Sequence, residues 1–315
     1  MERALQLALN GEGRVSPNPM VGAVIVNRGK IIGEGFHAFY GGPHAEVNAI
    51  NSVKPEDKHL LKDSTIYVTL EPCAHHGKTP PCANLIVNTG IPNVVIGSLD
   101  PNPLVAGKGV KILEDAGINV RRGIKEKECV NLNCRFMKAQ ICRMPFITLK
   151  WAQSADGYLA NISDNGQPEA VKFSSPLSSV WMHRERSRHD AIMVGGNTER
   201  LDNPQLNVRK WGGNSPQKFI AHFDKNLEKQ LMEMRKEGVT SLLVEGGSGL
   251  LNSFIENGWW DRIRVETSPI VLGRGLEAPK VPQDARLEES DYCGKNLIQT
   301  FKKVNQAEAV NTCKQ

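Results

Sequence analysis

Three side chains in the first half of the chain have the types that a hydrolytic metal site needs. His44 offers an imidazole nitrogen, and Cys73 and Cys82 offer two thiolates. These groups match the ligands of a zinc ion that keeps its fourth tetrahedral position open for water. Zinc lowers the pKa of bound water to about 7, so hydroxide is available at neutral pH. The residue types therefore predict a catalytic zinc site.

Glu46 follows His44 by two residues and predicts proton transfer at this metal. A carboxylate beside the bound water can take its proton and deliver it to a leaving nitrogen, which is general acid/base catalysis. The alternative is a closed structural zinc site in which His75 or His76 supplies a fourth ligand. A structural site has no use for a proton carrier, so the position of Glu46 favours the hydrolytic site.

The spacing of the two cysteines departs from the general pattern of zinc nucleobase deaminases. That pattern is H-x-E followed by P-C-x-x-C, whereas here eight residues separate Cys73 from Cys82. The longer segment, 71–82, resembles the deaminase half of the bifunctional riboflavin-biosynthesis deaminase/reductase family, the RibD/RibG family. The resemblance covers nearly all of the first half and is carried further by the runs 18–26, 35–37, 44–47, 67–70 and 100–107.

The resemblance implies a cytidine-deaminase-like, three-layer α/β/α domain with a pocket for a pyrimidine ribose phosphate. Lys78 could pair with the phosphate as a point charge, although locally it also reads as a solvated loop lysine. Asn18 and the run 100–103 are also typical of turns, so their place in the pocket rests on the resemblance. The implied substrate-binding residues are Asn18, His37, His75, Lys78, Asp100 and Asn102.

Local patterns predict the elements that position the metal ligands. Two strands at 21–26 and 31–35 are joined by a turn at 27–29, and a buried strand at 65–70 runs directly into Cys73. His44 opens one helix, and Pro80-Pro81 opens another whose first turn contains Cys82. A thiolate at a helix N-terminus gains from the helix dipole. Further helices are predicted at 2–10 and 109–116, and further strands at 94–97 and 118–121.

The second half begins with a new strand at 146–150, after a helix that contains Cys129 and Phe136. We place the domain boundary between 143 and 144. This half resembles the reductase domain of the same family, which implies a dihydrofolate-reductase-like α/β fold that uses NADPH. The runs that carry the resemblance are 146–157, 190–195, 201–209, 242–247 and 268–273.

A glycine-rich turn marks the expected cofactor site. No G-x-G-x-x-G motif follows the first strand of this half, which disfavours a Rossmann fold. A strand at 241–244 runs through Glu245 into the turn 246–249 and a helix at 250–256. Small residues before a helix N-terminus can hold a phosphate, although such a turn can also be plain geometry. The resemblance implies cofactor contacts at Ala152, Lys172, Thr198, Asp202, Gly246, Gly247, Ser248 and Gly249. It implies reductase substrate contacts at Lys150, Ala170, Arg186, Leu206, Arg209 and Glu245, the two arginines being suited to a phosphate.

Two departures from the family pattern fall in this half. Where the family commonly has Trp-Ile-Thr-Ser, the chain has Lys-Phe-Ser-Ser at 172–175, so Ala152, Ala170 and Lys172 correspond by position only. The segment between Arg209 and Glu245 is shorter than in the family, and at least one strand with its connection is missing from it. A strand at 216–221 passes almost at once into a helix at 226–237. The alternative to a working reductase is therefore a structural or oligomerisation module.

The overall composition predicts a globular protein of two domains, 1–143 and 144–315. Its 315 residues exceed the size of most single cores, about 250 to 300 residues, and 40% are hydrophobic and 23% charged. No run approaches the ~18 apolar residues of a membrane span, and the acidic start disfavours a secretory signal. Seven cysteines without framework spacing predict the reducing cytoplasm.

The residue types predict Zn²⁺, and the resemblance implies a bifunctional enzyme of riboflavin biosynthesis that also uses NADPH. We expect deamination of 2,5-diamino-6-ribosylamino-4(3H)-pyrimidinone 5′-phosphate, then hydride transfer to the ribose, and a homo-oligomer, dimer or tetramer. The rival nucleic-acid deaminase usually needs a basic, aromatic-lined groove. The net charge of +5 comes without a basic block, and only 6% of residues are aromatic. We therefore expect neither a nucleic-acid nor a membrane partner.

Overall fold

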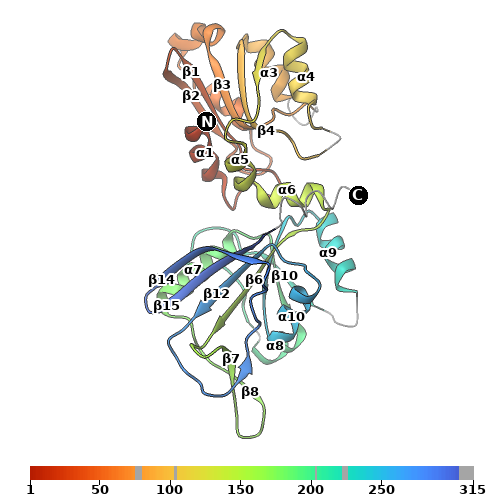
Figure 1. Cartoon of the computed structure of the whole chain (residues 1–315). Helices are drawn as coiled ribbons and strands as arrows, with labels where there is room; N and C mark the ends of the chain where they lie inside the picture. The colour runs from red at the N-terminus through yellow and green to blue at the C-terminus, as the bar shows by residue number, and fades with distance from the viewer. Residues whose placement is uncertain (75–79, 103–104, 203, 222–225, 305–315) are drawn as a thin grey trace. The chain divides into compact units, whose positions relative to one another are not determined.

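The computed structural model describes residues 1–74, 80–102, 105–202, 204–221 and 226–304. The chain divides into two compact units, Met1–Ile141 and Cys142–Gln315 (Figure 1). Each unit builds a sheet with helices on both faces, which confirms the predicted α/β class. Among the described residues, no helix is both long enough and apolar enough to cross a bilayer.

The N-terminal unit contains a mixed five-stranded sheet in the order β2-β1-β3-β4-β5. Its first two strands form a hairpin in which Asn27 pairs with Lys30. Arg28 and Gly29 between them both have positive φ, as a type I′ turn requires. The last three strands of the order are parallel neighbours. The strands are β1 (Gly22–Asn27), β2 (Lys30–Phe36), β3 (Thr65–Leu70), β4 (Asn93–Ser98) and β5 (Asn119–Arg121).

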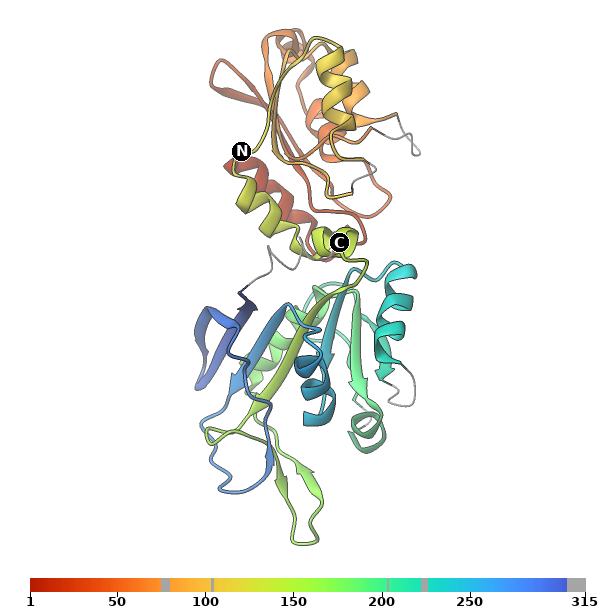
Figure 2. The same ribbon diagram turned by 45° about the vertical axis from the view of Figure 1, so that its right-hand side comes forward.

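Helices cover both faces of this sheet because alternate strand residues are apolar on each side. Ile25 and Ile66 pack in one core with α2, α3 and α4, whereas Val24 packs with Ala4 and Leu7 of α1 on the other face. Figure 2 shows α1 lying beside α5. The result is the expected three-layer arrangement. The helices are α1 (Glu2–Ala8), α2 (Ala45–Asn51), α3 (Cys82–Thr89), α4 (Lys108–Asp115), α5 (Glu126–Leu132) and α6 (Cys134–Ile141), with 3₁₀ turns η1 (Leu9–Gly11) and η2 (Pro55–Asp63).

The C-terminal unit contains a seven-stranded sheet in the order β10-β9-β11-β6-β12-β15-β14 and a small sheet β13-β7-β8. The strands from β10 to β12 in this order run parallel, and β15 and β14 are antiparallel. The strands are β6 (Phe146–Gln153), β7 (Tyr158–Ile162), β8 (Pro168–Ala170), β9 (Ala191–Gly195), β10 (Gln217–Ala221), β11 (Ser241–Glu245), β12 (Arg262–Thr267), β13 (Leu276–Glu277), β14 (Ala285–Cys293) and β15 (Asn296–Lys303).

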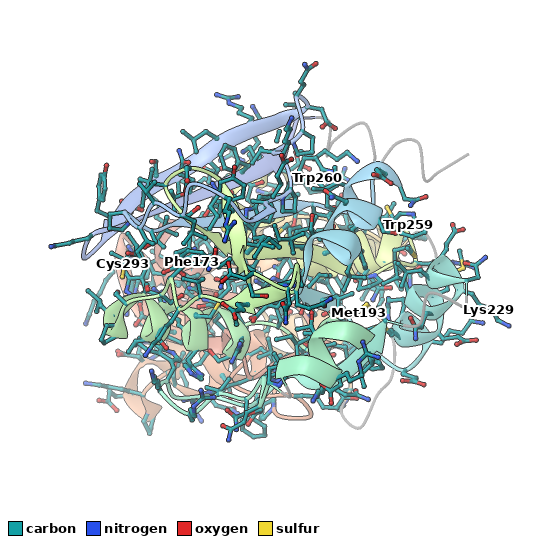
Figure 3. The ribbon with its side chains drawn as sticks, turned by 90° about the horizontal axis from the view of Figure 1, so that it is seen from below. Phe173, Met193, Lys229, Trp259, Trp260 and Cys293 are labelled. Atoms are coloured by element: carbon teal, nitrogen blue, oxygen red, sulfur yellow. The ribbon has the colours of Figure 1, made fainter. Side chains whose placement is uncertain are left out.

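The large sheet buries both of its faces. Met193 and Trp260 lie in a core shared with α9 and α10 (Figure 3), while Ile192 and Leu243 pack with Met182 of α7 on the opposite face. Because β6, β9 and β11 are parallel, their carboxyl ends meet at one edge, where α/β sheets commonly bind ligands. The helices are α7 (Pro176–Ser187), α8 (Gly196–Asp202), α9 (Leu227–Lys236) and α10 (Ser248–Glu256).

Candidate active sites

The fold of the N-terminal unit brings His44, Cys73 and Cys82 together. Their ligand atoms lie within 4.8 Å of one another, and the Nδ1 atom of His44 is 3.6 Å from Cys73 Sγ and 3.3 Å from Cys82 Sγ. A tetrahedral zinc ion with standard bond lengths places a nitrogen and a sulfur ligand about 3.6 Å apart. The three donors therefore fit zinc in both type and spacing.

Each ligand sits at the end of a regular element. His44 is the N-cap of α2, Cys82 is the first residue of α3, and Cys73 follows the end of β3. The N–H of Cys82 donates to Cys73 Sγ at 3.3 Å, and the N–H of Ala83 donates to the carbonyl of Cys73 at 3.2 Å. The start of α3 thus closes the long connection between the two cysteines.

The local charges favour a thiolate at Cys73. Hydrogen bonds from the Cys82 thiol, from His44 and from the Cys82 amide lower the pKa of Cys73 to about 4, against the opposing effect of burial. The hydrogen bond that the Cys82 thiol donates to Cys73, together with burial, raises the pKa of Cys82. A bound Zn²⁺ would remove the competition of the two sulfurs for one proton, because thiols that coordinate a metal are deprotonated outright.

Glu46 lies in the first turn of α2, two residues after the metal ligand His44. Its side chain is 3% exposed, and burial raises the pKa of its carboxyl to about 7. It also hydrogen-bonds the Cys82 thiol, so it lies at the metal cluster without being one of the three grouped ligands. His75 and His76, the candidates for a fourth ligand, lie outside the described residues.

Replacing Cys82 by serine is expected to remove the bound metal. The hydroxyl is a poor ligand for zinc compared with a thiolate, and two ligands do not hold the ion against dialysis. Purified wild-type protein should carry a stoichiometric zinc ion by atomic absorption, and the C82S variant should carry none. The C134S variant, altered at the start of α6 and outside the His/Cys cluster, should keep its zinc. Zinc retained by C82S would contradict the assignment.

Two of the predicted substrate-binding residues adjoin the cluster. Asn18 Nδ2 lies 3.1 Å from His37 Nε2, and His37 Nδ1 lies 3.0 Å from the carbonyl of Pro43. The carbonyl can only accept, so His37 carries its proton on Nδ1 and accepts from Asn18 through Nε2. The ring of His37 is 5.4 Å from that of His44, and burial lowers its pKa. Asn18 is thereby held next to the metal ligands.

The other predicted substrate residues follow β4. The Asn102 N–H donates to Asp100 Oδ1 at 2.8 Å, and the Asp100 N–H donates to Glu71 Oε2 at 3.2 Å. Glu71 precedes Pro72-Cys73, so it joins this segment to the metal site. The sequence reasoning quoted Glu71 as part of a motif but assigned it no role. Two further predicted residues, His75 and Lys78, lie outside the described residues.

A cavity of about 730 Å³ opens at the carboxyl edge of the large sheet in the C-terminal unit. This volume suits a small-molecule ligand. Most of the residues predicted for the reductase site line it. They are Lys150, Ala152, Ala170, Arg186, Thr198, Leu206, Glu245, Gly246, Gly247, Ser248 and Gly249. The structure therefore collects, from six separate segments, residues that the sequence grouped only by resemblance.

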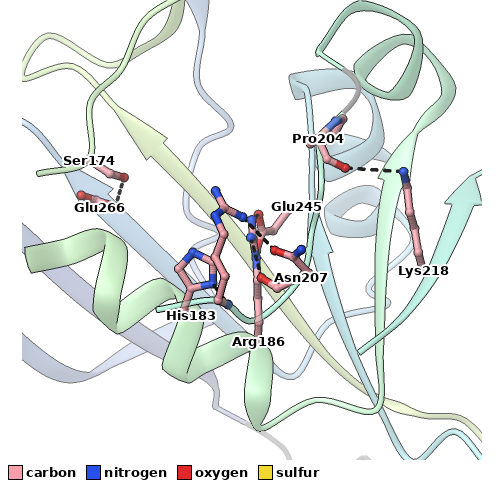
Figure 4. A network of polar contacts seen from close by, with 9 residues as sticks. Ser174, His183, Arg186, Pro204, Asn207, Lys218, Glu245 and Glu266 are labelled. Carbon is pink, nitrogen blue, oxygen red and sulfur yellow. Dashed lines mark hydrogen bonds and ion pairs between the residues drawn. The ribbon is translucent and has the colours of Figure 1, made fainter. Parts of the chain in front are cut away.

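An ion pair forms part of the wall of this cavity. Arg186 of α7 donates from Nε and Nη2 to the two carboxylate oxygens of Glu245, at 3.0 and 2.7 Å (Figure 4). Burial works against both charges, yet the contact lowers the pKa of Glu245 and raises that of Arg186. Arg186 also donates to the carbonyl of Asn207. Both side chains are thus held rigid at the carboxyl end of β11.

Three predicted residues are not placed in this cavity. Lys172 and Arg209 are exposed and are absent from its described lining, and the side chain of Asp202 lies outside the described residues. The sequence reasoning in turn missed Glu266, a buried carboxylate of β12 that lies in register with the cavity residue Ala152. It accepts from Ser174 at 2.8 Å (Figure 4) and from Asn296 at 2.6 Å. No local signal marked it, because Glu266 occupies the same alternating polar positions of the strand as Arg262 and Arg264.

The start of α10 has the features of a phosphate-binding turn. Gly247 is its N-cap and carries no side-chain cap, so backbone N–H groups of the first turn remain available to an anion. A Cβ on Gly249 would meet nothing within 4 Å, and one on Gly247 would lie 3.8 Å from Thr198 Oγ1. This open, glycine-lined end of the cavity fits the diphosphate of a dinucleotide such as NADPH.

Comparison with known proteins assigns both units. Residues 1–98 match the cytidine and deoxycytidylate deaminase zinc-binding region, and residues 145–225 and 221–307 match the RibD C-terminal domain. The chain is 37% identical to the riboflavin biosynthesis protein RibD of Aquifex aeolicus, over 88% of each chain. It belongs to the RibD family.

Solved structures of RibD proteins share the fold of the whole chain. One is a diaminohydroxyphosphoribosylaminopyrimidine deaminase/5-amino-6-(5-phosphoribosylamino)uracil reductase from Thermotoga maritima, which is 33% identical with a TM-score of 0.86 and covers 96% of this chain and 97% of its own. Another is RibD of Acinetobacter baumannii, which is 30% identical with a TM-score of 0.85 over the same shares of the two chains. The RibD resemblance predicted from the motifs is therefore confirmed.

The RibD comparison also bears on the shortened segment. The two matched parts of the C-terminal domain meet at 221–225, inside the stretch between Arg209 and Glu245. The alignment with the Aquifex protein spans 323 positions, more than the 315 residues of this chain, so that RibD protein has residues that this one lacks. The preceding strand, β10, is the edge strand of the sheet.

Proposed function

We propose that residues 1–143 deaminate 2,5-diamino-6-ribosylamino-4(3H)-pyrimidinone 5′-phosphate and that residues 144–315 reduce the product with NADPH. The product of the second step is 5-amino-6-(5-phosphoribitylamino)uracil. The observation that carries the proposal is the group of His44, Cys73 and Cys82 with the buried carboxylate of Glu46 beside it. Three ligands and a proton carrier are the minimal set for hydrolytic removal of an amino group.

The residues of the N-terminal unit divide the deamination between them. His44, Cys73 and Cys82 would hold zinc, which when bound makes water nucleophilic near neutral pH. Glu46 takes the proton of the attacking water and passes it to the leaving nitrogen while the new carbon–oxygen bond forms and the carbon–nitrogen bond breaks. Asn18 and His37, fixed by their mutual hydrogen bond, orient the pyrimidine. Ammonia and the pyrimidinedione leave.

The cavity of the C-terminal unit supplies the second step. The turn 246–249 and Thr198 would hold the cofactor, which donates a hydride when bound, and Lys150, Arg186 and Glu245 would orient the ribose phosphate. The hydride would be added to C1′ while the C1′–O4′ bond breaks and the ring oxygen takes a proton from water, which gives the open ribityl chain. None of the described lining residues lies between Leu206 and Glu245. The described cavity walls are therefore built without the segment between Leu206 and Glu245, and the NADPH assay below distinguishes a working reductase from a structural domain.

Coupled assays test both steps. With the diaminopyrimidine phosphate as substrate, ammonia release should precede NADPH oxidation, and NADPH should be consumed without delay when the deaminated product is supplied. A zinc-replete enzyme that releases no ammonia would refute the deaminase. Ammonia release without NADPH consumption would leave the C-terminal unit as a structural or oligomerisation module. Release of ammonia from single-stranded DNA, and not from the pyrimidine, would support the rival nucleic-acid deaminase.

Two further properties belong to the same proposal. We infer a homo-oligomer, a dimer or a tetramer, that works in the reducing cytoplasm. The free cysteines of the described residues include the metal-ligand pair, which zinc binding requires to be reduced. Light scattering of the purified enzyme gives the number of chains, and a monomer at assay concentration would contradict the first inference.

A further inference from the structure

Glu71 is a buried carboxylate whose described side-chain hydrogen bonds all come from the backbone of another segment. Its side chain follows β3, and the residue is 6% exposed. Oε2 accepts from the N–H groups of Asp100 and Gly107, at 3.2 and 3.0 Å. Oε1 accepts from the N–H groups of Gly109 and Val110, at 2.9 and 3.2 Å. One carboxylate thus binds four amides, two from residues that precede α4 (Lys108–Asp115) and two from its first turn.

These contacts make Glu71 the cap of α4. The N-cap residue of that helix, Gly107, has no side chain to satisfy the first-turn amides, and Glu71 supplies the acceptor from a distant part of the chain. The negative charge also lies at the positive end of the helix dipole. A Cβ on Gly109 would lie 2.0 Å from the carbonyl oxygen of Pro72, so the helix start is pressed directly against the turn 71–73.

The same contacts connect two parts of the proposed deaminase site. Cys73, a metal ligand, lies two residues after Glu71, and the clamped segment carries Asp100 and Asn102. We propose that Glu71 is a positioning residue that fixes Asp100, Asn102 and the start of α4 relative to the metal ligands, so that Asp100 and Asn102 recognise the polar edge of the ribosylaminopyrimidine phosphate. This inference rests on the proposed function, and Glu71 itself contacts neither the substrate nor the metal.

The E71Q variant tests this role. The glutamine amide keeps one acceptor oxygen, but its nitrogen then faces two N–H donors and cannot bind them. We expect the KM of the diaminopyrimidine phosphate to rise about 10- to 100-fold, with kcat reduced less and with zinc content unchanged. The E71D variant keeps the charge on a shorter side chain and should raise KM less. The matched control is E34Q, which changes a carboxylate of β2 that pairs with Arg3 at the surface and should leave KM unchanged.

A second measurement separates this inference from the proposed function. Hydrogen exchange should show protected amides at Gly107, Gly109 and Val110 in the wild type and faster exchange there in E71Q, with β3 and β4 unaffected. A wild type that releases no ammonia refutes the proposed function, and the exchange result still decides the role of Glu71. Unchanged KM in an active enzyme, or unchanged exchange in E71Q, overturns the positioning role.

Discussion

Replacing Glu46 by glutamine is expected to lower the kcat of deamination by about 10²- to 10⁴-fold, the usual contribution of a positioned general acid/base group. The amide has nearly the same shape and cannot carry the proton between the attacking water and the leaving nitrogen. Because the grouped metal ligands are His44, Cys73 and Cys82, E46Q should bind zinc as the wild type does. Ammonia release and atomic absorption on the same preparation measure both effects.

Two controls sharpen this experiment. The E56Q variant removes an exposed carboxylate in η2 and should deaminate at the wild-type rate. NADPH oxidation with the deaminated product should be equal in E46Q and wild type, since Glu46 belongs to the N-terminal unit. A loss of zinc in E46Q would show that Glu46 acts as a ligand, and wild-type turnover in E46Q would remove it from the mechanism.

Replacing Glu245 by alanine is expected to destabilise the C-terminal unit by about 3–5 kcal/mol and to abolish the reductase. The side chains of Arg186 and Glu245 are only 12% and 14% exposed, so truncation leaves a guanidinium without its counter-charge in a poorly solvated place. The double variant R186M/E245L replaces both charges with apolar groups. It should recover most of the stability and none of the reductase activity, because the polar wall of the cavity is gone.

A surface pair in the same unit provides the comparison. Glu288 lies 3.4 Å from Arg262 and 3.5 Å from Lys302, with about a third or more of each basic side chain exposed. The E288A variant should cost less than about 1 kcal/mol, as exposed ion pairs usually do. Urea unfolding followed by tryptophan fluorescence measures all variants, and the C-terminal unit holds Trp151, Trp181, Trp211, Trp259 and Trp260. Equal losses in E245A and E288A would contradict the importance of the buried pair.

The metal site was predictable from the sequence because its groups are coupled to local structure. His44 and Glu46 share the first turn of one helix, Cys73 follows a strand, and Cys82 starts the helix that Pro80-Pro81 introduces. Each of these features depends on neighbouring residues, through proline at a helix start and a short apolar run for the strand. The hairpin with its turn at 27–29 and the buried strand at 65–70 were local in the same way, and the structure has both.

The polar contacts beneath the two sites depend on the tertiary structure. Nothing near Glu71 in the sequence indicates that its carboxylate would cap a helix more than thirty residues away, and nothing near Arg186 indicates that Glu245, 59 residues later, is its partner. The exposure of Arg209 and Lys172 is equally invisible to a motif. A local pattern fixes the type of an element, whereas burial and pairing depend on which elements pack together. The sequence alone therefore determined the chemistry of the metal site and the order of the elements that hold its ligands. Only the packing of the sheets and helices decided which charged groups are buried and what neutralises them, because the cost of a buried charge depends on neighbours that are distant in the chain.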